Sequence, residues 1–164
     1  MQKLIIIRGN SGSGKTSVAK ELQRRLGRNT LVISQDTVRR EMLWVNDGGN
    51  SPAIMLLCEL LKYGYDHNEI TILEGILNSK WYDQLFKLAV KLFKENIYAY
   101  YYDLPFDETL KRHETKTVKN EFGENEMRKW WNEKDYIGLI PEKTITKELS
   151  LEETVDMIFS DINS

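Results

Sequence analysis

Short runs of large apolar residues alternate along the chain with longer segments in which apolar residues recur at helical spacing. The apolar runs predict buried strands at 4–7, 30–34, 70–73, 97–103 and 143–146. The segments between them predict helices at 17–26, 36–44, 52–65, 79–95, 105–115, 124–134 and 151–159. Because strands that alternate with helices are typical of α/β proteins, we expect a three-layer α/β sandwich with a mainly parallel five-stranded sheet. The length of 164 residues suits a single domain spanning 1–164.

The first apolar run leads directly into a glycine-rich loop with the pattern G-x-x-x-x-G-K-[ST], and a predicted helix follows it. Glycines let the backbone approach phosphates, and successive N–H groups with the helix N-terminus then form a nest for anions. Lys15 is expected to reach the β- and γ-phosphates, and the Thr16 hydroxyl is expected to bind Mg²⁺. We therefore predict a P-loop site for ATP and Mg²⁺ that consists of Gly9, Asn10, Ser11, Gly12, Ser13, Gly14, Lys15, Thr16 and Ser17.

The net charge and the cysteine content limit the partners and the cellular compartment that we expect for this protein. A formal net charge of −2 provides no global basic field for nucleic acid, although a local basic groove stays open. The single cysteine, Cys58, lies in an apolar run and is expected to be a buried hydrophobic residue, which fits a reducing compartment. The sequence has no signal-peptide pattern and no apolar run near the ~20 residues that span a bilayer. We expect a cytoplasmic protein with no membrane contact and no evident obligate protein partner.

Acidic and basic residues follow the second and third predicted strands, at the sheet edge where the P-loop lies. Asp36 could accept a proton from an incoming hydroxyl and align it for in-line attack, or it could merely cap the helix that starts at Thr37. Arg39 and Arg40 follow, and either could hold an acceptor group or an anionic substrate. Glu74 could orient Mg²⁺ through water or contact the substrate, or it could be a solvated carboxylate at a strand end. The adjacent Gly75 would allow close approach by a ligand.

A charged segment at about 111–131 predicts a helical lid, because a kinase needs positive charge over the transferring phosphoryl group and must exclude water. The alternative is a pair of solvated charged helices. Trp130 and Trp131 are adjacent and cannot face one direction on a helix, so one is expected in the core and the other could cover the substrate cleft. Three lid cations are candidates for contact with the phosphates: Arg112, Lys116 and Arg128.

The P-loop, together with Ser34-Gln35-Asp36-Thr37-Val38-Arg39-Arg40, resembles the small P-loop kinases grouped around polynucleotide 5′-hydroxyl kinase, zeta-toxin kinases and chloramphenicol phosphotransferase. The segment 103–113 resembles the passage from strand to lid in that group, and the resemblance extends over about 1–131. It implies that Asp36 is the general base, that Arg39 contacts the acceptor side, and that Arg112 contacts the ATP phosphates. Lys116 stands where an arginine would be more usual.

These observations favour a kinase that uses Mg²⁺ and ATP to phosphorylate a hydroxyl of a small molecule or of a nucleic-acid end. The catalytic residues would be Lys15, Asp36 and Arg112. One alternative is an NTPase or nucleotide switch without an acceptor, but the sequence has no guanine-reading Asn-Lys-x-Asp element. A catalytically dead nucleotide-binding protein is a second alternative, which the intact Lys15, Thr16 and Asp36 disfavour. The acceptor, the donor base and the oligomeric state stay open.

Overall fold

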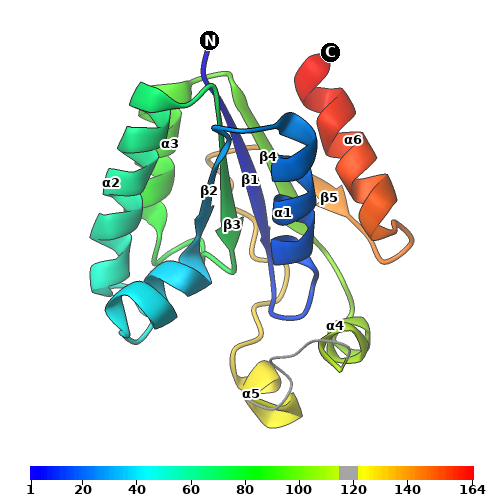
Figure 1. Ribbon diagram of the computed structural model, residues 1–164. Coiled ribbons are helices and arrows are strands. Elements are labelled where there is room, and N and C mark those ends of the chain that lie inside the picture. The colour runs from blue at the N-terminus through cyan, green and yellow to red at the C-terminus, as the bar shows by residue number, and fades with distance from the viewer. Residues whose placement is uncertain (115–121) are drawn as a thin grey trace.

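In the computed structural model, a parallel sheet forms the middle layer of the molecule (Figure 1). The structure describes residues 1–114 and 122–164. Within these residues the sheet has five strands in the order β2-β3-β1-β4-β5, and all neighbouring pairs are parallel. The strands are β1 (Lys3–Gly9), β2 (Leu31–Ser34), β3 (Ile70–Gly75), β4 (Ile97–Tyr102) and β5 (Glu142–Ile145).

Helices cover both faces of this sheet. Figure 1 shows α2 and α3 over one face and α1 and α6 over the other. The α-helices are α1 (Lys15–Leu26), α2 (Pro52–His67), α3 (Asp83–Phe93), α4 (Phe106–His113), α5 (Glu124–Lys129) and α6 (Leu151–Asn163). A π-helix, η1 (Thr37–Leu43), follows β2. The predicted three-layer α/β sandwich is therefore confirmed.

Strand β1 shows why both faces of the sheet are apolar. Because successive side chains of a strand point to opposite faces, Leu4 and Ile6 join the core on the α2 and α3 side. Ile5 and Ile7 join the core on the α1 and α6 side. All four are fully buried, and each such burial stabilises the fold by about 1.5–3 kcal/mol. The continuous apolar run thus places β1 in the centre of the sheet and presents the loop after it at one edge.

Two predicted helices are shorter in the structure by four residues or more at one end. The helix expected from 79 begins only at Asp83, because the Asn78 side-chain oxygen accepts hydrogen bonds from the main-chain N–H groups of Lys80 and Trp81 and holds this segment in a turn. The helix expected to reach 134 ends at Lys129. The chain after it is held by Asn10 of the P-loop, which bonds the main chain of Asn132.

The expectation that one of the two adjacent tryptophans is a core residue is wrong. Trp130 is 39% exposed, and Trp131 is half-buried. The Trp130 ring packs edge-on against Phe122, and the Trp131 ring packs edge-on against Phe106. Both tryptophans therefore serve packing within the segment around α4 and α5. Among the described residues, none of the helices has the length and hydrophobicity that a membrane span requires.

Candidate active site

The P-loop joins β1 to α1 at the edge where the carboxyl ends of the strands lie, the edge at which ligands bind in open α/β sheets. Gly9, Gly12 and Gly14 have φ values of 149°, 82° and 106°, which side chains rarely adopt. A Cβ on Gly9 would lie 2.8 Å from the Cβ of Tyr102, and one on Gly12 would lie 2.5 Å from the Thr109 carbonyl oxygen. The loop is therefore packed closely against β4 and α4.

Lys15 begins α1, and its side chain is folded back along the loop. Its Nζ donates hydrogen bonds to the Asn10 carbonyl oxygen at 2.9 Å and to the Ser13 Oγ at 3.2 Å. Lys15 is only 8% exposed, so its charge lies within the P-loop. This is the placement from which an ammonium group can meet the terminal phosphates of a nucleotide.

Thr16 and Glu74 bring two oxygen ligands together beside the P-loop. The Thr16 hydroxyl donates to Glu74 Oε2 at 3.1 Å, and Glu74 is almost fully buried at the end of β3. Mg²⁺ prefers oxygen ligands and usually combines one or two protein groups with phosphates and water. A hydroxyl and a carboxylate in this position fit Mg²⁺. The described residues contain no cluster of three or more acidic, His or Cys side chains that could hold a metal without a nucleotide.

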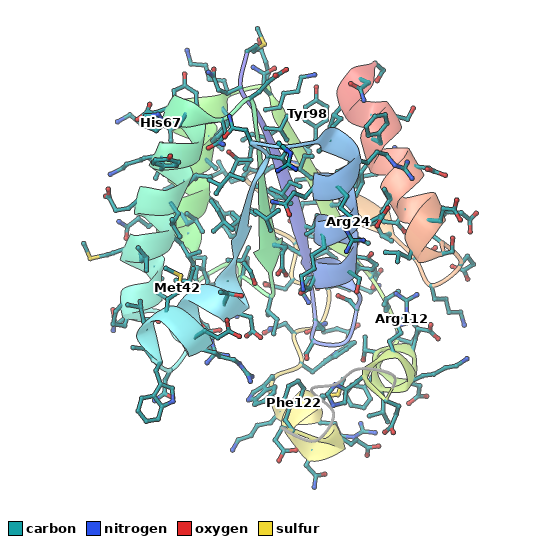
Figure 2. The ribbon with its side chains drawn as sticks, viewed as in Figure 1. Arg24, Met42, His67, Tyr98, Arg112 and Phe122 are labelled. Carbon is teal, nitrogen blue, oxygen red and sulfur yellow. The ribbon has the colours of Figure 1, made fainter. Side chains whose placement is uncertain are left out.

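Arg112 is a lid cation that contacts the P-loop. It extends from α4 toward the loop (Figure 2) and donates from Nη1 to the Ser13 carbonyl oxygen at 2.6 Å. Its Nε also contacts Glu108 at 3.1 Å, which orients the guanidinium. Arg112 opposes the rise in the pKa of Tyr102, which burial raises to about 12. A positive charge is therefore fixed beside the phosphate-binding loop.

Arg128, the second candidate lid cation, makes contacts within the lid. Among the described residues, Arg128 contacts the Glu124 carboxylate at 3.4 Å and lies over the ring of Phe106 at 4.2 Å. Its side chain is 58% exposed. Lys116 lies outside the described residues, 1–114 and 122–164. Contacts from these two cations to a nucleotide stay predictions.

Asp36 lies two residues beyond β2, where it meets two arginines of η1. Arg39 Nη2 and Arg40 Nε lie 3.3 Å and 3.1 Å from the same carboxylate oxygen, Oδ1. The Asp36 side chain caps no helix N–H, since the Thr37 N–H donates to the Ser34 Oγ instead. The capping role considered as the alternative for Asp36 is therefore absent. Its carboxylate is 63% exposed and can reach a ligand.

Arg40 also connects η1 to the lid. Its guanidinium lies 5.4 Å from the ring centroid of Phe122 and 5.8 Å from that of Trp130. A hollow of about 410 Å³ opens on the η1 side and is lined by Arg39, Arg40, Glu41, Trp44, Val45 and Asn46. Trp44 ends η1 in a left-handed conformation and is 90% exposed at this hollow. Arg39 and Arg40 therefore form ion pairs with Asp36 and also line an open pocket.

The space beside Gly75, which was expected to admit a ligand, is filled by the Gln35 side chain. A Cβ there would lie 2.5 Å from the Gln35 side-chain oxygen, so the glycine makes room for Gln35. Gln35 in turn accepts from the Leu77 N–H and donates to Tyr82 and Asp47. Burial, together with the hydrogen bond to Asp47, raises the pKa of the Tyr82 hydroxyl well above its ordinary value. This network fixes the loops after β2 and β3.

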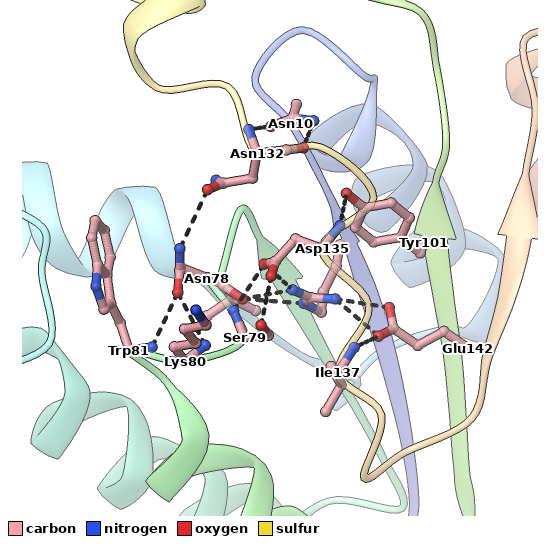
Figure 3. Close-up of polar contacts among 12 residues, drawn as sticks. Asn10, Asn78, Ser79, Lys80, Trp81, Tyr101, Asn132, Asp135, Ile137 and Glu142 are labelled. Atoms are coloured by element: carbon pink, nitrogen blue, oxygen red, sulfur yellow. Dashed lines mark hydrogen bonds and ion pairs between the residues drawn. The ribbon is translucent and has the colours of Figure 1, made fainter.

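Sequence reasoning missed Arg8, which is fully buried just before the P-loop. It bonds both oxygens of Glu142 at 2.9 Å, Asp135 at 2.9 Å and the Leu77 carbonyl oxygen at 2.9 Å. Two of its partners, Asp135 and Glu142, are labelled in Figure 3. Buried arginines are tolerated when their charge is paired in this way. Arg8 thus ties β1 to the start of β5, to the chain after the lid and to the loop after β3. The only signal in the sequence is a charged residue inside an apolar strand.

Asn10 and Asn78 were also missed as partners of Asn132. The Asn10 side chain forms two hydrogen bonds of 2.7 Å with the main-chain N–H and carbonyl of Asn132. The Asn78 side-chain N–H donates to the Asn132 side-chain oxygen at 3.3 Å. Figure 3 draws this contact as a dashed line. The chain that leaves the lid is therefore attached to the P-loop on one side and to the loop after β3 on the other.

Comparison with known proteins agrees with this geometry. A family model for an AAA domain matches residues 4–99, which include the P-loop, Asp36, Arg39 and Glu74. The chain belongs to this AAA domain family. No curated protein sequence matches the chain.

Several solved structures resemble this member of the AAA domain family, and two of those described below are kinases. A gluconokinase from Sinorhizobium meliloti superposes with a TM-score of 0.72 at 16% identity, over 98% of this chain and 91% of that one. The APS kinase of Mycobacterium tuberculosis, in complex with AMPPNP and APS, superposes with a TM-score of 0.65 at 21% identity. The match covers 99% of this chain and 98% of that one. The Deinococcus radiodurans tunicamycin resistance protein superposes with a TM-score of 0.68 at 14% identity, over 99% of this chain and 96% of that one. These likenesses show a shared fold along nearly the whole chain.

Proposed function

We propose that this protein is a kinase that transfers the γ-phosphate of ATP, bound with Mg²⁺, to a hydroxyl group of a small molecule. The observation that carries the proposal is the register of three neighbouring strands. Ser34 of β2 pairs with Glu74 of β3, and Glu74 pairs with Ile7 of β1, two residues before the P-loop. Asp36 therefore emerges one strand away from the Thr16–Glu74 pair. A carboxylate beside the phosphate site is what activation of a hydroxyl requires.

In the reaction, the acceptor oxygen attacks the γ-phosphorus and forms a new O–P bond. The bond from the γ-phosphorus to the β,γ-bridging oxygen breaks, ADP leaves, and the hydroxyl proton passes to Asp36. Lys15 and the main-chain N–H groups of the loop hold the β- and γ-phosphates, and Arg112 neutralises charge as it develops. Thr16 and Glu74 would hold Mg²⁺, which would help to neutralise the charge of the transferring phosphate. Placement and fixed charge supply most of the acceleration.

The acceptor side of the site consists of Arg39 and Arg40 on η1. The names of the gluconokinase and the APS kinase denote small-molecule acceptors, which supports a small molecule here as well. A nucleic-acid 5′ end is the second candidate, based on the resemblance of the Asp36–Arg39 pattern to the group around polynucleotide 5′-hydroxyl kinase. A cytoplasmic location would suit both, because the lone cysteine is a free thiol and ATP is supplied there.

The test is label transfer from γ-³²P-ATP with Mg²⁺ to pooled hydroxyl compounds, which include sugars, sugar acids, nucleosides, nucleotides and 5′-hydroxyl oligonucleotides. We expect label on an acceptor with the natural chain and none with Lys15→Ala, whose fold is checked by circular dichroism. Release of inorganic phosphate at the same rate with and without every acceptor would instead favour an NTPase or nucleotide switch. Unchanged transfer in Lys15→Ala would remove the P-loop from the mechanism.

A further inference from the structure

His113, the last residue of α4, is almost fully buried, with 2% of its surface exposed. Its Nε2 lies 2.8 Å from the carbonyl oxygen of Phe122, nine positions further along the chain. Because a carbonyl oxygen can only accept a hydrogen bond, Nε2 carries the hydrogen and donates it. The two rings also stack, with centroids 4.5 Å apart and an interplanar angle of 26°. One side chain thus ties the end of α4 to the chain two residues before α5.

Packing alone does not account for a histidine at this position. Among the described residues, the buried Nδ1 of His113 has no hydrogen-bond partner. A buried polar atom without a partner destabilises a fold, and a phenylalanine would stack on Phe122 without burying such an atom. What a phenylalanine could not supply is the hydrogen bond to the Phe122 carbonyl oxygen. That bond is therefore what the histidine contributes.

Phe122 is held by two other elements, so it can serve as a fixed anchor for α4. The ring of Trp130, which follows α5 directly, packs edge-on against the Phe122 ring with centroids 5.0 Å apart. The Arg40 guanidinium of η1 lies 5.4 Å from the centroid of the same ring. The hydrogen bond from His113 therefore connects the end of α4 with both α5 and η1.

The two helices that this bond joins both pack against one glycine of the P-loop, Gly12. A Cβ on Gly12 would lie 2.5 Å from the Thr109 carbonyl oxygen of α4 and 3.1 Å from the Met127 Cε of α5. Space above the loop is therefore set to within a few tenths of an ångström by both helices. A bond that fixes α4 relative to α5 thus also fixes α4 relative to the phosphate-binding loop.

Arg112 precedes His113 in the last turn of α4 and donates to the Ser13 carbonyl oxygen of the P-loop at 2.6 Å. We infer that His113 is a positioning residue, whose bond to Phe122 holds the turn that presents Arg112 to the nucleotide phosphates. The inference rests on the proposed kinase function, in which Arg112 neutralises charge on those phosphates. His113 itself touches neither substrate, so its whole effect on the nucleotide passes through Arg112.

The test is a double-mutant cycle on the dissociation constant of N-methylanthraniloyl-ATP, measured by fluorescence with Mg²⁺. Arg112→Gln should weaken binding by about 10–100-fold, as for the loss of one hydrogen bond from a charged group. His113→Phe keeps the ring stack and should weaken binding by about three- to tenfold, a usual size for the coupling between neighbours. In the Arg112→Gln background, His113→Phe should have almost no further effect.

Two further variants separate positioning from general damage to the fold. His113→Gln keeps an N–H that can reach the Phe122 carbonyl oxygen, so it should recover most of the affinity that His113→Phe loses. His67→Phe is the matched control, because His67 also ends a helix, α2, and stacks on a ring, that of Tyr63 at 4.4 Å. Figure 2 shows His67 at the end of the molecule opposite Arg112, and this variant should bind the analogue as the natural chain does.

The outcomes decide between this inference and the kinase proposal. An equal loss from His113→Phe in both backgrounds would overturn the inference, because His113 would then act on the fold rather than on Arg112. Unchanged binding in His113→Phe or in Arg112→Gln would overturn it too and leave the kinase proposal to the label-transfer screen. A chain that binds no analogue would overturn both. If urea unfolding shows that His113→Phe is not folded, His113→Asn, whose shorter amide does not reach the carbonyl oxygen, replaces it in the cycle.

Discussion

Thr16 Oγ1 lies 3.1 Å from Glu74 Oε2, so the first turn of α1 and the end of β3 meet through a hydroxyl and a buried carboxylate. The two residues are 58 positions apart in the chain. Their contact depends on the direct pairing of β1 with β3, which sets Glu74 opposite Ile7. The Thr16 hydroxyl of α1 and the Glu74 carboxylate of β3 thus place two oxygen atoms at one point beside the P-loop.

If that point holds Mg²⁺, Glu74→Gln should weaken the response to the metal. The amide keeps the size of the side chain and can still bond Thr16, but it removes the negative charge that favours a divalent cation. We expect the Mg²⁺ concentration for half-maximal transfer to rise about tenfold or more, as for loss of a partner that orients a metal site. A Mg²⁺ titration at fixed ATP measures this. Thr16→Ser, which keeps the hydroxyl, is the control, and an unchanged midpoint in Glu74→Gln would separate Glu74 from the metal.

Asp36→Asn tests the proposed base. Transfer should fall by about 10²–10⁴-fold, the usual contribution of general acid–base catalysis, while ATP binding stays intact. Because the Asp36 side chain caps no helix N–H, stability should change little, within about 0.5 kcal/mol. Single-turnover transfer and urea unfolding provide the two measurements. A loss of less than about threefold in transfer would be too small for a base of this kind.

Arg112 and Arg128 offer a comparison of two lid cations. Arg112 donates to the Ser13 carbonyl oxygen at 2.6 Å, whereas Arg128 lies over Phe106. Arg112→Gln should therefore lower kcat by about 10²–10³-fold, the range for loss of one charge-stabilising donor, and Arg128→Gln should lower it far less. Arg112→Lys should recover only part, since lysine keeps the charge without the planar fork. Equal losses in the two glutamine variants would mean that Arg128 also reaches the nucleotide.

The sheet and the P-loop could be predicted because their signals are local. The apolar run of β1, the glycine pattern and the helical spacing after Lys15 occupy neighbouring positions. Residues such as Asp36 and Glu74 could be assigned to one edge because parallel strands end on the same side. The predicted role of Arg112 at the loop is consistent with its contact to Ser13, although that role stays a prediction.

The networks around the site could not be predicted, because their partners are far apart in the chain. Arg8 meets Glu142 across 134 positions, and Asn10 meets Asn132 across 122. Gly75 next to Glu74 suggested room for a ligand, yet the space holds the Gln35 side chain. Spacing in the sequence carries no information on such pairs. They depend on how the loops after β3 and after the lid fold over the sheet edge.

Tyr102 of β4 is buried, and we expect its ionisation to lower the stability of the fold at alkaline pH. Burial raises the pKa of the Tyr102 hydroxyl from 10.0 to about 12, and Arg112 and Thr154 only partly oppose this. Because the pKa is higher in the folded state, the contribution of Tyr102 is complete below pH 10 and is lost as the pH rises toward 12. The difference in unfolding free energy between the natural chain and Tyr102→Phe should shift by up to about 1.4 kcal/mol per pH unit in this window. Urea unfolding from pH 8 to 11 should detect the onset, and parallel curves would contradict it.

Asn132 attaches the chain after the lid through its main chain, which Asn10 binds, and through its side chain, which contacts Asn78. Two variants test these contacts separately. Asn10→Ala removes both 2.7 Å hydrogen bonds to the Asn132 main chain and leaves its N–H and carbonyl without their partner. Unfolding should become easier by about 1–3 kcal/mol, the usual penalty for buried groups left unsatisfied. Nucleotide affinity should fall as well, because the Asn10 carbonyl oxygen also accepts from Lys15 and its position depends on the same anchor.

Asn132→Ala is the matched control for Asn10→Ala. It keeps the main-chain groups that Asn10 binds and loses two side-chain hydrogen bonds of 3.3 Å, one with Asn78 and one with the Trp130 carbonyl oxygen. We expect a smaller change in stability, below about 1 kcal/mol, and little change in nucleotide affinity. Urea unfolding and titration with a fluorescent ATP analogue measure the two properties. If both variants weaken nucleotide binding equally, the side-chain hydrogen bonds of Asn132 would be what holds the P-loop, and its main-chain bonds would be secondary.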